Sequence, residues 1–147
     1  MDRAYPTAMA FLREAEDAGR RGVDLRTYGG RLLRLSSLAE ALAEAGHESN
    51  VAHSYGRFAR NAVVQGAAAE LFKAWAATVR AGLADLDARI VLCLHDELLV
   101  ETTYENAETV VEVIGRSLDR TAAWWSAGSG VRFVTDTTIA ASWAEAK

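Results

Sequence analysis

Residues 89–102 read RIVLCLHDELLVET, and this stretch decides the fold. Apolar and β-branched residues dominate its two arms, Arg89 to Leu94 and Leu98 to Thr102, which is typical of buried strands. His95-Asp96-Glu97 alone lies between the arms. The stretch therefore predicts an antiparallel hairpin with a polar tip. Cys93, inside the first arm, is predicted to be a small buried hydrophobic residue.

Helical patterns precede and follow this hairpin. From about Asn50 to Leu83, apolar residues recur every three or four positions and predict one long helix. Residues Asn106 to Trp125 predict a second helix, with Trp124 on its buried side. Near the start of the chain, Pro6 suits a first helical turn and predicts a helix that ends near Gly19.

Short strands complete the predicted fold. Residues 23–27 and 31–35 flank Tyr28-Gly29-Gly30, whose glycines permit a tight hairpin, and residues 131–135 are predicted as a last strand. Hairpins mixed with helices, rather than regular strand-helix-strand units, predict an α+β fold: a small antiparallel sheet covered by long helices. All 147 residues are predicted to form one domain, because no repeat or low-complexity linker interrupts them.

Composition and charge restrict the function classes. No apolar run approaches the roughly 20 residues of a membrane span, and no signal pattern is present, so we expect a soluble, cytoplasmic chain with no membrane partner. The net charge of −4 argues against a free-standing nucleic-acid binder. Its distribution weakens that objection, since residues 1–80 hold 11 basic and 9 acidic residues while residues 81–147 hold 5 and 11. The first part could contact phosphates, and the second could hold cations.

The hairpin tip is the first candidate site. Asp96 and Glu97 are paired carboxylates on a turn, and Mg²⁺ takes one or two protein carboxylates while water and substrate phosphates fill its shell. Nucleotidyl transfer needs such carboxylates, because two metal ions stabilise the attacking and leaving oxygens. A charged tip that simply faces water is the commoner situation for an arbitrary tripeptide, so the interpretation depends on the rest of the chain.

A polar stripe on the long helix is the second candidate site. Arg57, Asn61 and Gln65 are four residues apart, drift about 80° around the helix in total and span about 12 Å of its axis. Such side chains can donate to phosphate, to sugar and to the acceptors of a minor groove, which checks duplex shape without reading sequence. The alternative is a helix face that is polar without function. Gly66 weakens that alternative slightly, because a glycine inside a helix costs about 1 kcal/mol and suggests a close backbone approach.

Both constellations occur together, in the order found in family A DNA polymerases. Residues 56–71, in which an arginine, an asparagine and Gln65-Gly66 precede a run of small residues, resemble the family's helix pattern, and residues 94–98 resemble its motif C. The chain departs from the pattern at Val63, where many members have proline, but this removes no functional group. Three further segments are similar to the family and extend the resemblance over nearly the whole chain: Tyr5-Pro6, Thr27 with Gly30-Arg31, and Ser142-Trp143.

The resemblance implies a DNA-directed DNA polymerase of replication and repair, which adds dNTPs to a primer 3′ end with Mg²⁺ as cofactor. Asp96 and Glu97 would bind the metal, and His95 would lie near the primer 3′ end, so that these three residues form the catalytic set. The implied contacts with primer-template DNA come from Arg31, Arg57, Asn61 and Gln65.

Two parts of the family's site have no counterpart in this sequence. Motif A is missing, and so is the fingers helix, since neither Lys73 nor Lys147 precedes a Tyr-Gly pair as that pattern requires. Residues 1–147 are therefore predicted to be the C-terminal part of a polymerase palm domain. We expect the isolated chain to be inactive, because one carboxylate-bearing hairpin cannot hold two metal ions well. The alternative expectation is that it needs a complementing N-terminal polymerase chain, because the missing strand would leave an apolar sheet edge exposed.

Two other functions stay open at this point. A non-catalytic DNA-binding or structural remnant of a polymerase would retain the helix stripe while Asp96 idles. A metal phosphohydrolase could use His53, His95-Asp96 and Asp136 as ligands, although the His-Asp pairs of such enzymes lie on helices rather than between strands.

Overall fold

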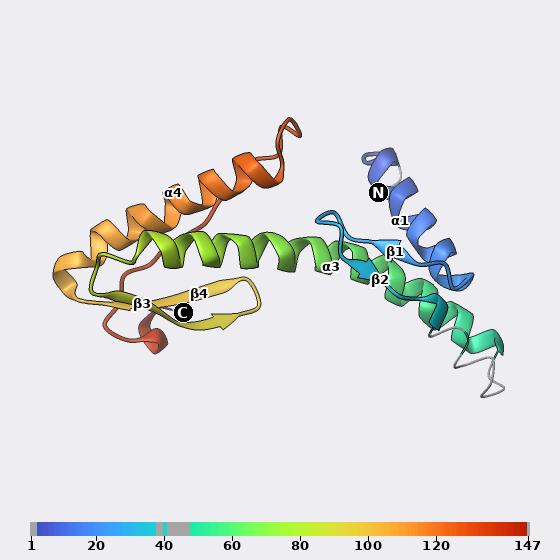
Figure 1. The fold of residues 1–147 in the computed structure, drawn as a ribbon, viewed down its shortest axis with the longest axis horizontal. Helices are drawn as coiled ribbons and strands as arrows, with labels where there is room; N and C mark the ends of the chain where they lie inside the picture. The colour runs from blue at the N-terminus through green and yellow to red at the C-terminus, as the bar shows by residue number, and fades with distance from the viewer. Residues whose placement is uncertain (1–2, 38–39, 41–47, 147) are drawn as a thin grey trace. The chain divides into compact units, whose positions relative to one another are not determined.

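A computed structural model describes residues 3–37, 40 and 48–146 of the chain (Figure 1). Contacts divide the chain into two compact units, Met1–Ala68 and Ala69–Lys147. The described residues form α-helices and two antiparallel sheets of two strands each, which confirms the predicted α+β class. No helix in these ranges is long and apolar enough to cross a membrane.

The first unit is built on two closely crossing helices. Helix α1 (Pro6–Arg20) begins at the predicted proline, and helix α3 (Glu48–Gly82) confirms the long predicted helix. A Cβ atom added to Gly19 would lie 2.5 Å from the Tyr55 carbonyl oxygen and 2.6 Å from the Ala59 Cβ. The two helices therefore approach each other through small residues at a position where no side chain fits.

A short hairpin lies between these helices in the sequence. Strands β1 (Leu25–Arg26) and β2 (Leu32–Leu33) pair antiparallel and are shorter than the predicted strands. The reason lies at buried Thr27, whose amide donates to the Arg31 carbonyl (3.0 Å) while its Oγ1 accepts from the Arg31 amide (3.0 Å). Next to the turn, one of the two hydrogen bonds thus goes to a side-chain hydroxyl instead of to the backbone of the opposite strand.

The second unit has its own hydrophobic core. It combines the C-terminal part of α3 with helix α4 (Ala107–Trp125) and the hairpin of strands β3 (Ala88–Leu94) and β4 (Glu97–Thr102), all close to the predicted bounds. Trp75 is buried in this core and also makes a polar contact there. Its Nε1 donates to the Ile114 carbonyl of α4 at 3.2 Å. The buried cluster consists of Trp75, Val79, Leu83, Val110, Val113, Ile114 and Leu118.

Three predictions about the second unit are wrong. Trp124 is 74% exposed because the buried stripe of α4 ends one turn earlier, at Thr121. Cys93 is exposed rather than buried, since a sheet of two strands leaves alternate side chains uncovered. Residues 131–135 form no strand, because they join no hydrogen-bonded ladder with the described strands, although Phe133 still packs against the core.

Candidate functional site

The β3–β4 hairpin places the predicted carboxylates at its tip. Leu94 pairs with Glu97, so the loop holds two residues, His95 and Asp96, rather than the three predicted, and Glu97 begins β4. His95 adopts a φ of 52°, in the left-handed region that non-glycine residues seldom occupy. A positive φ at the first of two loop residues suits the twist of a hairpin. The backbone is thus conformationally costly at His95, the residue that precedes Asp96 and Glu97.

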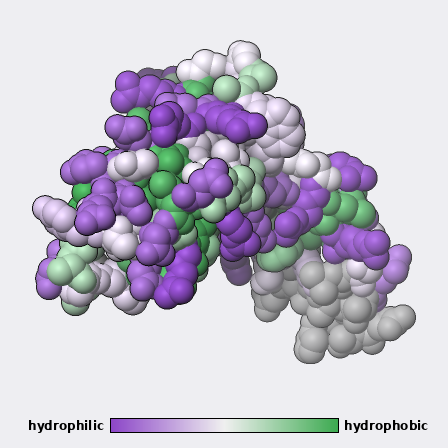
Figure 2. Space-filling view, turned by 60° about the vertical axis from the view of Figure 1, so that its left-hand side comes forward, coloured by the Kyte–Doolittle hydropathy of each residue, from purple (hydrophilic) through white to green (hydrophobic). Residues whose placement is uncertain are grey.

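The hairpin also presents uncovered apolar surface. Among the described strands, β3 pairs with β4 alone, and the register shifts between Ile90 and Leu92. Val91 is 45% exposed and Leu94 is 37% exposed. Figure 2 shows hydrophobic residues reaching the surface between hydrophilic ones on the face that it draws. Such strand surface is a place where another chain can pair or pack.

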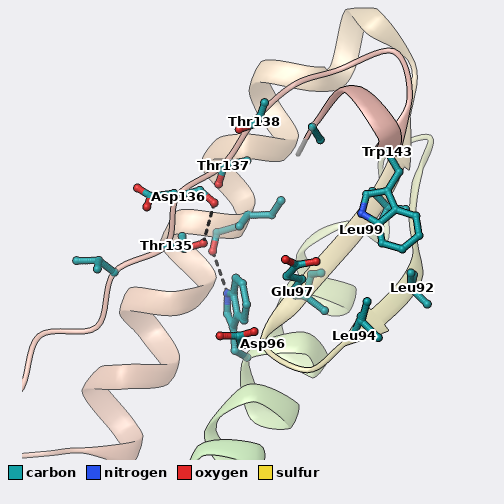
Figure 3. Close-up of a pocket in the computed structure, with 15 residues that line it drawn as sticks. Leu92, Leu94, Asp96, Glu97, Leu99, Thr135, Asp136, Thr137, Thr138 and Trp143 are labelled. Carbon is teal, nitrogen blue, oxygen red and sulfur yellow. Dashed lines mark hydrogen bonds between the residues drawn. The ribbon is translucent and has the colours of Figure 1, made fainter.

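A cavity of about 480 Å³ lies beside the hairpin tip (Figure 3). Asp96 and Glu97 border it from the hairpin, and residues 135–138 border it from the segment that follows α4. Both carboxylates are exposed, so they stay accessible to water and to a ligand. Residues with carboxylates and residues with hydroxyls therefore line a space large enough for small polar groups.

Asp136 contributes to this cavity without joining a metal cluster. Its carboxylate is directed away from Asp96 and Glu97 in Figure 3. Within residues 3–37, 40 and 48–146, no three His, Cys, Asp or Glu side chains are grouped so that they could hold a metal ion. The ligands that the metal-phosphohydrolase alternative requires are not grouped among the described residues of the second unit, and its His95-Asp96 pair lies on a strand turn instead of a helix.

The polar stripe lies on the exposed side of α3 in the first unit. Arg57, Asn61 and Gln65 are all exposed, whereas Ala59 and Val63 on the opposite side are buried. The Arg57 Nη2 donates to the Ser54 hydroxyl at 3.4 Å, one turn earlier on the same helix. This contact is not among the predictions from sequence, although the i−3 spacing of Ser54 from Arg57 is a signal for it.

Gly66 anchors the β1–β2 turn against α3. An added Cβ at Gly66 would lie 2.5 Å from Thr27 Cγ2, which confirms the close approach that this glycine suggested. Because Thr27 also makes two hydrogen bonds to the backbone of Arg31, the turn that carries Arg31 is fixed to α3 one residue beyond Gln65. The DNA-contact candidates Arg31, Arg57, Asn61 and Gln65 thus belong to the first unit, and His95, Asp96 and Glu97 belong to the second.

Comparisons with known proteins match most of the chain. The family model described as DNA polymerase family A matches residues 2–145. The chain is similar to the thermostable DNA polymerase I of Thermus aquaticus, with 30% identity over 111 residues that cover 76% of this chain and 13% of that protein. For its counterpart from Thermus thermophilus the identity is 32% over 108 residues, or 74% of this chain and 12% of that protein. DNA polymerase I of Caldicellulosiruptor bescii is 36% identical over 69 residues, 46% of this chain and 8% of that protein. The chain spans about an eighth, or less, of the length of these curated relatives.

Proposed function

The chain belongs to DNA polymerase family A, and from that premise we propose that it serves as the C-terminal part of a polymerase palm domain in template-directed DNA synthesis. The reaction would transfer a nucleotide from a dNTP to a primer 3′ end, in DNA replication or repair in the cytoplasm. The observation that carries this proposal is the hairpin tip that presents Asp96, in its two-residue turn, and Glu97, at the start of β4, beside a cavity that residues 135–138 also line.

Asp96 and Glu97 fit Mg²⁺ by the chemistry of their donors. Mg²⁺ binds through one or two carboxylates and keeps positions for water and phosphate oxygens, and these two residues supply that number on a fixed turn. When bound, the metal would supply the positive charge that stabilises the attacking and leaving oxygens. His95, next to them on the same turn, would contact the primer 3′ end.

The exposed stripe of α3 would hold the primer-template duplex. Arg57 supplies a charge for phosphate, while the amides of Asn61 and Gln65 can donate to purine N3 and pyrimidine O2. Arg31 would add a phosphate contact from the turn that Thr27 fixes to α3. These contacts are independent of sequence, as a replicating enzyme requires.

A complementing polymerase chain would complete the active site. Two metal ions need more carboxylates than one hairpin tip offers, and the described residues contain no cluster of three potential ligands. The uncovered surface of β3, including Val91, gives such a chain a place to pair. Motif A and the fingers helix would both come from polypeptide outside residues 1–147, either in such a chain or upstream in the same protein.

A second candidate, a non-catalytic DNA-binding remnant, is favoured by the same shortage of metal ligands. It would retain the contacts of Arg57, Asn61 and Gln65 with duplex DNA and leave Asp96 without a role. Metal-dependent nucleotide incorporation separates this candidate from the polymerase, because a remnant would bind DNA without extending a primer.

Primer extension with Mg²⁺ and four dNTPs tests the proposal in two arms. The chain alone is expected to extend nothing. A polymerase I from Thermus aquaticus that lacks the matching segment is expected to regain extension when this chain is supplied. Asp96→Asn should reduce the regained rate at least about 100-fold, as loss of one electrostatic contact to the transition state does. Asp87→Asn, which alters an exposed aspartate just before β3, should not.

Each arm has an outcome that contradicts it. Extension by the isolated chain that Asp96→Asn abolishes would show a complete site and refute the need for a partner. Equal rates for Asp96→Asn and wild type in the complemented enzyme would refute the metal-binding role of this residue.

A further inference from the structure

Two exposed apolar residues flank the polar stripe of α3. Phe58 and Val64 are each 51% exposed. At about 100° per residue, they lie about 60° to either side of Asn61, just outside Arg57 and Gln65, which lie about 40° to either side. The exposed face of α3 is therefore ordered apolar, polar, polar, polar, apolar around the helix.

Packing among the described residues of the first unit does not account for the apolar character of Phe58 and Val64. The opposite side of α3 makes the contacts with α1 and the β1–β2 turn, through Ala59 and Gly66. Single exposed hydrophobic residues are common and need no explanation by themselves. Their symmetric placement about a stripe of hydrogen-bond donors is the feature that calls for one.

The shape of a DNA minor groove matches this order. A helix with its side chains is about 10–12 Å across, whereas the groove is about 6 Å wide, so the helix backbone stays outside and side chains reach in. Residues in the middle of the helix face then meet the base edges. Residues at its flanks meet the groove walls, which are deoxyribose rings and present mainly C–H surface.

We propose that Phe58 and Val64 are positioning residues that pack against deoxyribose rings on the two walls of the primer-template minor groove. The inference rests on the proposed DNA contact of the stripe and adds a preference for a DNA duplex over one that contains RNA. A ribose 2′-hydroxyl at the same place would lose water against an apolar side chain without gaining a hydrogen-bond partner. The pair therefore favours DNA over RNA in the bound duplex.

Fluorescence anisotropy of a labelled primer-template DNA duplex, titrated with the full chain at several salt concentrations, tests the proposal. Phe58→Ala and Val64→Ala should each raise Kd roughly three- to tenfold, as partial burial of one apolar side chain implies. Neither should change the slope of log Kd against log salt. Arg57→Ala should instead lower that slope by about one, because it removes a phosphate contact.

Matched variants separate a contact from a general effect on the fold. Phe58→Leu keeps an apolar side chain and should retain most of the affinity, while Phe11→Ala removes a 52% exposed phenylalanine from α1 and should change nothing. On a duplex with an RNA primer, Phe58→Ala should bind with a smaller DNA-over-RNA ratio than wild type. Far-UV circular dichroism checks that each variant keeps its helices.

The outcomes distinguish this inference from the proposed function. Absence of salt-dependent duplex binding by the wild type overturns both. A slope that changes in Arg57→Ala, together with equal Kd values for Phe58→Ala, Phe11→Ala and wild type, overturns the inference alone. An unchanged DNA-over-RNA ratio in Phe58→Ala refutes the preference.

Discussion

Asp24 joins the two ends of the β1–β2 hairpin through its side chain. Its Oδ1 accepts hydrogen bonds from the backbone amides of Leu35 (2.8 Å) and Ser36 (2.9 Å). The Ser36 amide is the main cause that lowers the pKa of this carboxyl below its ordinary value, and the Ser36 side chain, the Leu35 amide and the charge of Arg34 add to it. A single carboxylate therefore fixes the chain where it leaves the hairpin.

The lowered pKa predicts a pH-dependent effect of Asp24→Asn. A carboxyl whose pKa is lower in the folded than in the unfolded state stabilises the fold above its unfolded pKa, and the contribution disappears as pH falls through the folded value. Asp24→Asn should thus lower the free energy of unfolding at neutral pH, and its difference from wild type should shrink in acid. Urea unfolding followed by circular dichroism at both pH values measures this. The same difference at both would contradict the role given to the ionised carboxylate.

At the scale of elements, the contact between α3 and the β1–β2 turn depends on one missing side chain. An added Cβ at Gly66 meets the buried Thr27 methyl group at 2.5 Å, and Thr27 has little room to move because its backbone and hydroxyl bind Arg31. In an isolated helix the change from glycine to alanine would be favourable by about 1 kcal/mol. Helix propensity therefore favours alanine at position 66, whereas packing against Thr27 favours glycine.

A double-mutant cycle separates these two effects. Gly66→Ala should destabilise the wild-type chain by about 1–3 kcal/mol, as overpacking does. In a Thr27→Ser background, where the methyl group is gone and the hydroxyl remains, the same change should be neutral or stabilising. Urea unfolding of the four proteins gives the coupling. If Gly66→Ala has the same effect in both backgrounds, the contact is not what requires glycine.

The helices and strands that can be predicted from the sequence are those that a pattern of neighbouring residues is sufficient to form. Apolar spacing and a first-turn proline suffice for α1, α3 and α4, and two apolar arms around a polar tip suffice for the β3–β4 hairpin. Residues 131–135 have strand-like composition, but a strand also needs a neighbour to pair with, and local sequence does not supply that information. The predicted burial of Cys93 is wrong for a related reason, since burial of a strand depends on what covers its second face.

The candidate sites also divide into parts that local sequence predicts and parts that only long-range packing brings together. The neighbouring carboxylates of Asp96 and Glu97, and the spacing of the α3 stripe, can be read from sequence because each lies within one element. The threonine-rich wall of the cavity at residues 135–138 could not be predicted, because it faces the hairpin across some 40 positions of sequence. Long-range packing alone brings these segments together.

At the scale of the whole molecule, the chain forms two compact units, and one helix runs through both. All four tryptophans lie in the second unit, at positions 75, 124, 125 and 143. Tryptophan fluorescence therefore reports unfolding of the second unit, whereas far-UV circular dichroism also reports α1. The two signals together can show whether each unit has its own cooperative transition.

Core variants in each unit are expected to move these signals separately. Val79→Ala, at a fully buried position of the second core, should lower stability by about 2 kcal/mol and shift the fluorescence midpoint. Gly19→Val, which places a side chain where Tyr55 and Ala59 leave no space, should shift part of the circular dichroism transition and leave the fluorescence midpoint in place. Coincident shifts of both signals in both variants would show instead that α3 couples the units into one cooperative fold. Separate shifts would mean that the hairpin with Asp96 and Glu97 can stay folded when the unit that carries the α3 stripe opens.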